Sequence, residues 1–215
     1  MSKINHRLSR RAFTASSLSA ASLLFAGRSL AQDHAVSPTP EQALGPFYPS
    51  GYAGEDDADL TMIDGRTERA LGDVIEVTGR VLDRHGNPMS GARIELWQAN
   101  AAGRYAHAND ISTGALDPNF QGMARLVTGS SGEWRIRTIK PRFYDTPLGL
   151  RTPHIHFDVQ GTSHRLITQM YFDDEADQNS GDFVYAGLGG QAPMTVARTD
   201  GPASYRWDIV LMDAV

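Results

Sequence analysis

Residues Ile75–Val81 read IEVTGRV, and the spacing of their side chains decides the fold class. Ile75, Val77 and Val81 are apolar, the small Gly79 continues the same series, and polar residues stand between them. Successive side chains of a strand point to opposite faces. The alternation therefore predicts a half-buried strand, with one face in a core and the other toward solvent.

Turn-forming residues and further short apolar stretches lie on both sides of this strand. The segment 83–91 (DRHGNPMSG) is dense in residues that favour turns. No long amphipathic helix is evident, and the glycine-rich segment 174–206 gives no clear pattern. We therefore predict an all-β fold, an antiparallel β-sandwich with few short helices and long loops. Its other strands are expected at residues 92–98, 133–138, 154–159, 166–172 and 207–212.

The first 31 residues have the features of an export signal. Residues 9–13 (SRRAF) contain paired arginines, residues 15–26 are mildly apolar, and residues 29–31 (SLA) fit a cleavage site. These features predict a periplasmic or secreted protein with no membrane span in its mature form. An ordinary secretory signal with a chance arginine pair is the alternative. The predicted organisation is a twin-arginine signal peptide over 1–31, a flexible leader over 32–43 and one β-sandwich domain over 44–215.

The composition excludes several classes of site. The chain has 215 residues, of which 40% are hydrophobic, enough for one sizeable core. It has no cysteine, so disulfides and thiolate metal sites are excluded. Its formal net charge is −5 and its basic residues are spread along the chain, so no nucleic-acid partner is expected.

Two histidines stand two residues apart in the stretch Arg151–Phe157 (RTPHIHF). On a strand, His154 and His156 share one face, while Ile155 and Phe157 point to the opposite face and the core. Histidine is the commonest metal ligand, and this spacing lets two imidazoles reach one ion. From the spacing alone, two structural histidines, each hydrogen-bonded, are an equally good interpretation.

Two imidazoles do not complete a metal site, and cysteine is absent. Tyrosine is another source of ligands, because a phenolate is a hard anionic donor suited to a hard trivalent cation such as ferric iron. A bound cation lowers the pKa of its ligand, so a phenol with an ordinary pKa of ~10 can bind in the ionised form. Spacing alone does not choose among the seven tyrosines.

Five motifs, in order along the chain, resemble those of the intradiol ring-cleaving dioxygenases, most of all the iron-bearing beta chain of protocatechuate 3,4-dioxygenase. The resemblance extends from about Leu44 to Asp213, nearly all of the predicted mature chain. The motifs are Gly45–Pro49 (GPFYP), Leu96–His107 (LWQANAAGRYAH), Thr138–Tyr144 (TIKPRFY), Arg151–Phe157 (RTPHIHF) and Leu166–Phe172 (LITQMYF).

This resemblance implies a cofactor, a reaction and a set of roles. Ferric iron, Fe(III), would be bound by Tyr105, Tyr144, His154 and His156. A catechol-type substrate would be cleaved by O2 between its hydroxyl-bearing carbons, giving a cis,cis-muconate-type dicarboxylate in aromatic catabolism. Tyr144 would serve as a base when the catechol displaces it. Arg151 would stabilise charge on the ring, Gln169 would be a polar residue beside the ligands, and Trp97 would line the substrate pocket.

Other functions remain open at this point. The turn and strand pattern also resembles transthyretin-like sandwiches, which would make the chain a non-catalytic binding module. A zinc hydrolase would use the two histidines with a carboxylate, and an Fe(II) extradiol enzyme would use a 2-His-1-carboxylate set. The resemblance allows a homo-oligomer or a second chain without iron, and it does not select one catechol. The discriminator is whether Tyr105, Tyr144, His154 and His156 converge on one point.

Overall fold

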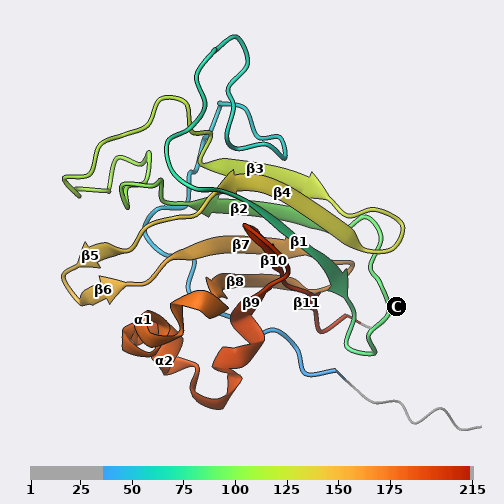
Figure 1. Ribbon diagram of the computed structural model, residues 1–215. Helices are drawn as coiled ribbons and strands as arrows, with labels where there is room; N and C mark the ends of the chain where they lie inside the picture. Colours follow the sequence, from blue (N-terminus) through green and yellow to red (C-terminus); the bar gives the residue numbers. More distant parts are fainter. Residues whose placement is uncertain (1–35, 214–215) are drawn as a thin grey trace, which may run out of the picture. The chain divides into compact units, whose positions relative to one another are not determined.

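The computed structural model describes residues 36–213 (Figure 1). The predicted signal peptide over 1–31 and the start of the predicted leader lie outside these residues. No helix in the described part is long and apolar enough to cross a membrane. The strands of this part are β1 (Val74–Leu82), β2 (Arg93–Gln98), β3 (Met123–Val127), β4 (Glu133–Ile139), β5 (Tyr144–Thr146), β6 (Gly149–Arg151), β7 (His154–Gln160), β8 (Arg165–Phe172), β9 (Val196–Thr199), β10 (Ser204–Arg206) and β11 (Ile209–Val210).

The strands form two layers that are joined through β9. One layer has the order β3-β2-β7-β8, with all three pairings antiparallel. The other contains β4, β1 and β10, and β9 pairs with both β10 and β8. Strands β5 and β6 form a separate hairpin beside the layers (Figure 1). The layers place β7 at the centre of its sheet, between β2 and β8.

The core lies between the two layers, as the alternation in β1 predicts. Ile75, Val77 and Val81 are buried against Phe157 and other apolar residues of β2, β7 and β8 in one cluster. The intervening residues of β1 and β4 are more exposed. Burial of one face of each strand is the main stabilising contribution in such a sandwich. The predicted all-β sandwich with few short helices is confirmed.

The pairing directions differ in part from the antiparallel prediction. β1 is parallel to both β10 and β11, and β8 is parallel to β9. Parallel neighbours require a crossover connection, and the segment between β8 and β9 supplies one. Alternation along a strand reveals which face is buried, but strand direction depends on the connection. The sequence pattern therefore could not predict these three pairings.

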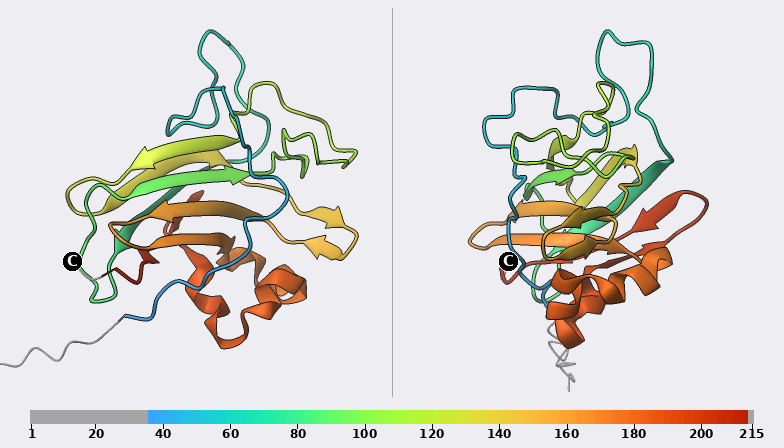
Figure 2. Two further views of the ribbon diagram at one scale, coloured as in Figure 1. Left: turned by 180° about the vertical axis from the view of Figure 1, so that it is seen from behind. Right: turned by 90° about the vertical axis from the view of Figure 1, so that its left-hand side faces the viewer.

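The glycine-rich segment that gave no pattern contains this crossover. It forms a set of short helical turns that pack beside β8 and then returns as strands β9 and β10 (Figures 1 and 2). Each helix is too short to show a 3.6-residue apolar repeat, which explains the missing signal. The turns are η1 (Asp173–Glu175), α1 (Ala176–Gly181), α2 (Phe183–Gly187) and η2 (Gly189–Thr195).

The described part of the predicted leader, residues 36–43, lies against the sandwich. The amides of Thr39 and Gln42 donate to the carbonyl oxygens of Val210 and Ile167 at 3.0 and 2.8 Å. Both side chains are buried. The side-chain Nε2 of Gln42 also donates to the carbonyl oxygen of Gln169 at 3.2 Å. These bonds hold residues 39–42 in place beside β11 and β8 and bring Gln42 close to a predicted site residue.

Gly79 in β1 has no room for a side chain, and we expect Gly79→Ala to destabilise the protein. An added Cβ would stand 1.7 Å from the carbonyl oxygen of Trp207, a backbone atom that cannot yield without moving β10 and β11. Such overpacking costs about 1–3 kcal/mol. Urea unfolding measures this loss. Gly181→Ala is the control, because a Cβ there meets nothing within 4 Å, and an equal loss in both variants would contradict the steric explanation.

Candidate active site

The outer face of β7 carries the two predicted histidine ligands. His156 pairs with Trp97 of β2 and with Gln169 of β8, and His154 pairs with Tyr171. These side chains alternate with the core residues Ile155, Phe157 and Val159 and therefore point away from the core. The alternation thus places two imidazoles side by side, with their ring centroids 4.9 Å apart.

Two tyrosines from separate segments reach the same point. Tyr105 follows β2 in a loop, and Tyr144 is the first residue of β5. Each phenol oxygen lies 3.4 Å from Nε2 of His154. The Tyr105 ring centroid is 5.5 Å from that of Tyr144 and 6.1 Å from that of His156. The four predicted ligands therefore lie close together. This convergence is the condition that distinguishes a Tyr-Tyr-His-His metal site from the other interpretations of the sequence.

Burial controls the charge of these four groups. All four side chains are buried. Burial lowers the pKa of His154 and of His156 well below the usual range, so both imidazoles are neutral and keep a lone pair for a ligand. Burial also raises the pKa of Tyr105 and of Tyr144, so the phenols are protonated until a cation compensates their charge.

The orientation of the two histidines is set by their neighbours. Nδ1 of His154 lies 2.6 Å from the carbonyl oxygen of Thr152. That ring nitrogen must donate, so Nε2 presents its lone pair toward the tyrosines. The ring of His156 stacks on Trp97 at 4.9 Å, and its buried Nδ1 has no hydrogen-bond partner among the described residues. Gly45 approaches the same ring, because its Cβ position is 3.2 Å from Cε1 of His156.

The donor set fits a hard trivalent metal ion. Two neutral imidazoles and two phenols, which become anionic on metal binding, supply the nitrogen and oxygen ligands that ferric iron takes. Within residues 36–213, no three His, Asp or Glu side chains gather into a metal-binding group. Asp158, on the same face as the histidines, is bound by Arg165 at 2.6 Å. The carboxylate-containing sites of a zinc hydrolase or an extradiol enzyme therefore find no support in the described part.

Arg151 lies at the edge of the ligand cluster and is almost fully buried. Its Nε donates to Asp182 Oδ2 at 2.8 Å, and its Nη2 donates to Gln169 Oε1. Burial raises the pKa of Tyr144, and the positive charge of Arg151 opposes that rise. The guanidinium is thus close enough to act electrostatically on the site. Gln169 contacts Arg151 and accepts from the Tyr171 hydroxyl at 3.2 Å.

Asp182 is a site residue that the sequence did not reveal. Its Oδ2 accepts from Arg151 and from the Thr152 amide at 3.0 Å, and its Oδ1 accepts from the second and third amides of α2. Asp182 therefore anchors the backbone amide of Thr152, the residue whose carbonyl oxygen orients His154. An Asp that caps a short helix was the available signal, but it lies in the segment without periodicity.

Phe47 belongs to the GPFYP motif and stacks on Tyr105 at 4.6 Å. It also meets the Tyr144 ring edge-on, so the motif covers the tyrosine pair. Trp97 is buried against His156 and lines a cavity of about 40 Å³ together with Tyr105 and Phe47. Its role as a wall of the substrate pocket stays a prediction. By stacking on His156, Trp97 is placed to hold that imidazole ring in position.

A larger cavity of about 820 Å³ opens beside the ligands. Tyr144, Arg151 and Phe47 line it on the side of the ligand cluster. Its other walls come from the loop 109–114, the β5–β6 hairpin and the first residue of α2. This volume lies in the about 300–1,000 Å³ range that holds small-molecule ligands. A ligand in this cavity would contact Tyr144 and Arg151.

A family model described as "Dioxygenase" matches residues 44–213. The chain belongs to the intradiol dioxygenase family. The protocatechuate 3,4-dioxygenase beta chain of Burkholderia cepacia is 46% identical to it over 132 residues. That match covers 59% of this chain and 56% of the relative, so the chain spans about half the length of this curated intradiol dioxygenase. The resemblance noted in the sequence is confirmed.

Two further matches extend over more of the chain. The protocatechuate 3,4-dioxygenase alpha chain of Burkholderia cepacia is 31% identical, over 80% of this chain and 90% of the relative. Among solved structures, the dioxygenase domain of a fusion with a carbohydrate-binding protein from Streptomyces sp. SirexAA-E superposes with a TM-score of 0.63. It is 28% identical and covers 83% of this chain and 100% of that chain. The intradiol dioxygenase fold therefore accounts for most of the described residues.

Proposed function

We propose that this chain is an intradiol dioxygenase that cleaves a catechol-type ring between its two hydroxyl-bearing carbons with O2. The product would be a cis,cis-muconate-type dicarboxylate. The observation that carries this proposal is the convergence of Tyr105, Tyr144, His154 and His156 in a buried cluster beside a ligand-sized cavity. A transthyretin-like binding module would not need these four groups at one point.

The cofactor in this proposal is Fe(III), held by the two tyrosines and two histidines. When bound, the ferric ion acts as a Lewis acid and holds the catechol in position for its reaction with O2. The neutral imidazoles offer lone pairs, and the two phenols supply compensating negative charge. Tyr144 borders the cavity, so its phenolate oxygen is placed to take a proton from an incoming catechol hydroxyl.

Arg151 and its partners supply the electrostatic part of the proposal. A fixed guanidinium beside the ring stabilises negative charge that develops during the reaction. Asp182 and Gln169 hold that guanidinium, and Gln42 and Tyr171 extend the hydrogen-bond network. Because the whole network is buried, the guanidinium needs little rearrangement when substrate binds.

The direct test is an aerobic assay of the purified, iron-loaded protein on catechol, 3,4-dihydroxybenzoate and hydroxyquinol. We expect O2 uptake matched one to one by a muconate-type product, identified by mass spectrometry. A ring-opened semialdehyde would indicate extradiol cleavage. If no product formed from any catechol by a protein shown to contain iron, the proposal would be wrong.

The Tyr144→Phe variant tests the ligand assignment separately. Ferric phenolates absorb visible light, so the loaded wild-type protein is expected to be coloured. Tyr144→Phe removes one phenol and should shift this band and lower kcat by about 10²–10⁴-fold, the range for loss of a proton-transfer group. Tyr185→Phe is the control, since Tyr185 contacts Tyr171 and not the ligand cluster. An unchanged spectrum in Tyr144→Phe would remove Tyr144 from the site.

We also propose export by the twin-arginine route to the periplasm or beyond, supported by the paired arginines in residues 9–13 and the SLA sequence at 29–31. N-terminal sequencing of the exported protein tests cleavage after Ala31.

Matches to both the alpha and the beta chain of protocatechuate 3,4-dioxygenase favour an assembly, either of identical copies or with a second chain lacking iron. Light scattering on the purified chain tests self-association.

A further inference from the structure

The entrance of the large cavity is apolar and exposed. Ile111, Phe143, Leu148 and Phe183 line it, and we call these four residues the apolar rim. Ile111 is 90% exposed and Leu148 is 77% exposed, while the two phenylalanines are more than a third exposed. Scattered apolar residues on a surface are ordinary, but four around one cavity indicate a binding surface.

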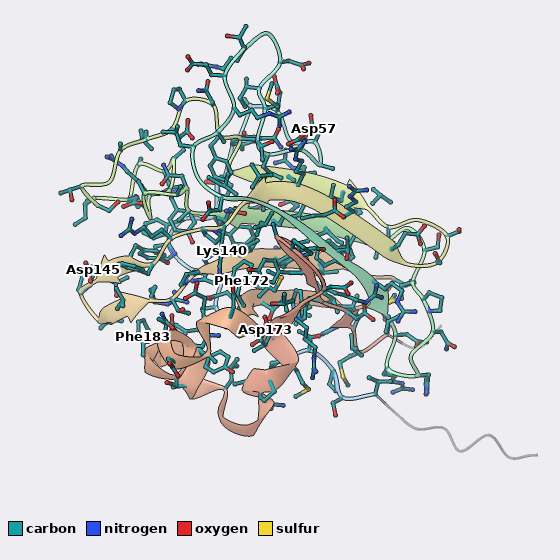
Figure 3. All side chains as sticks on the ribbon, viewed as in Figure 1. Asp57, Lys140, Asp145, Phe172, Asp173 and Phe183 are labelled. Carbon is teal, nitrogen blue, oxygen red and sulfur yellow. The ribbon has the colours of Figure 1, made fainter. Side chains whose placement is uncertain are left out.

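The rim residues come from four separate segments. Ile111 lies in the loop 109–114, Phe143 directly precedes β5, Leu148 is in the β5–β6 turn, and Phe183 starts α2. Figure 3 shows Phe183 below the β5–β6 hairpin that carries Asp145, on the same side of the molecule. The Phe183 ring also lies 5.5 Å from the Arg151 guanidinium. The rim is therefore continuous with the ligand cluster.

The charged residues of the cavity offer little to an anionic substituent. Arg151 is the only buried cation among the described lining residues, and Asp182 and Gln169 already hold it. Arg142 is exposed and lies over the Phe143 ring at 5.0 Å, and the exposed Asp145 carries the opposite charge. Asp110 accepts from the amides of Tyr105 and Ser112. Apart from the already paired Arg151, a carboxylate on the substrate would meet only the solvated guanidinium of Arg142, which binds weakly.

We infer that the preferred substrate is a catechol carrying an uncharged apolar substituent, such as a second aromatic ring. This inference rests on the proposed function and specifies its substrate class. The hydroxyl-bearing ring would lie near Tyr144 and Arg151, and the substituent would cover the apolar rim. The cavity of about 820 Å³ has room for both. Burying an aromatic substituent against this rim should tighten binding by about tenfold or more relative to catechol.

The test compares catechol, 3,4-dihydroxybenzoate and 4-phenylcatechol on the iron-loaded protein. Calorimetric titration without O2 measures binding in the absence of turnover, and aerobic assays give kcat/KM. We expect 4-phenylcatechol to bind about tenfold or more tightly than the other two. In the double variant Ile111→Ser/Leu148→Ser this preference should fall to near unity, while binding of catechol itself stays within a factor of about 3.

Leu71→Ser is the matched control. Leu71 is 70% exposed, a fraction similar to the 77% of Leu148, but it does not line the cavity. It should keep the full preference for 4-phenylcatechol. The inference would be overturned if the double variant kept the wild-type preference for 4-phenylcatechol. It would also be overturned if 3,4-dihydroxybenzoate bound more tightly than 4-phenylcatechol.

The two readouts separate the possible failures. A protein that cleaves catechol but shows no rim-dependent preference would overturn the substrate inference alone. A protein that neither binds nor cleaves any catechol would overturn the proposed function as well. A final experiment measures the oligomeric state of the wild type and of the double variant by sedimentation. A wild-type dimer that the serine substitutions dissociate would assign the rim to a second copy of the chain and overturn the inference.

Discussion

The His154→Ala variant should lose its bound iron and its ring-cleaving activity. His154 is central to the cluster, because both phenol oxygens lie 3.4 Å from its Nε2 and Thr152 fixes its other nitrogen. Loss of an outer partner of a metal ligand costs about 10–100-fold in metal affinity. Loss of a ligand itself should cost more. We expect activity to fall at least about 100-fold, with iron content measured by plasma mass spectrometry and product formation by chromatography.

His164→Ala is the control for this variant. His164 lies in the turn between β7 and β8, at the opposite end of the hairpin from His154, and its Nδ1 accepts from the Met212 amide. It should retain iron and most of its activity. Circular dichroism would check that both variants fold. A folded His154→Ala protein with full iron content and normal activity would show that the metal lies elsewhere.

The second large effect is expected from Asp182→Asn, which removes a buried negative charge and keeps nearly the same shape. Asn also caps helices well, so the amides at the start of α2 keep an acceptor. Arg151 would be left as a buried cation without its ion-pair partner. Breaking a buried pair in this way costs about 3–5 kcal/mol. In a chain of this size the melting temperature should fall by roughly 6–20 °C.

Activity separates a positioning role of Asp182 from a purely structural one. Below the melting temperature of the variant, we expect kcat to fall about 10–100-fold, because Asp182 holds both Arg151 and the amide of Thr152, whose carbonyl oxygen orients His154. Asp208→Asn is the control, since the exposed Arg80–Asp208 pair contributes less than about 1 kcal/mol. A variant that melts earlier but retains wild-type kcat would limit Asp182 to a structural role.

The sequence predicted those parts of the structure that depend on local patterns. Alternation in residues 75–81 and 154–159 predicted the two faces of β1 and β7, so the position of His154 and His156 opposite the core followed directly. The two tyrosines were different. Each approaches from a loop or a short strand, and no spacing rule connects Tyr105 or Tyr144 to the histidines. Only the resemblance of their motifs to a known family selected them among seven tyrosines.

What the sequence could not predict depends on contacts between distant segments. Asp182 lies 31 residues from Arg151 along the chain, and their contact requires the crossover to fold back beside β6. Gln42 reaches Gln169 over a separation of 127 residues. The parallel pairing of β8 with β9 has the same origin. These contacts arise from topology, which single-residue preferences and short periodicities do not encode.

The crossover between β8 and β9 has a consequence for how this protein can change. One segment links the two layers of the sandwich and also supplies the carboxylate that anchors Arg151. An insertion or deletion in this segment would alter the pairing of β8 with β9 and the orientation of the Arg151 guanidinium at the same time. Substrate range should therefore diversify more readily through changes in the β5–β6 turn and the 109–114 loop. Both segments border the same cavity, and neither links the two layers or anchors Arg151.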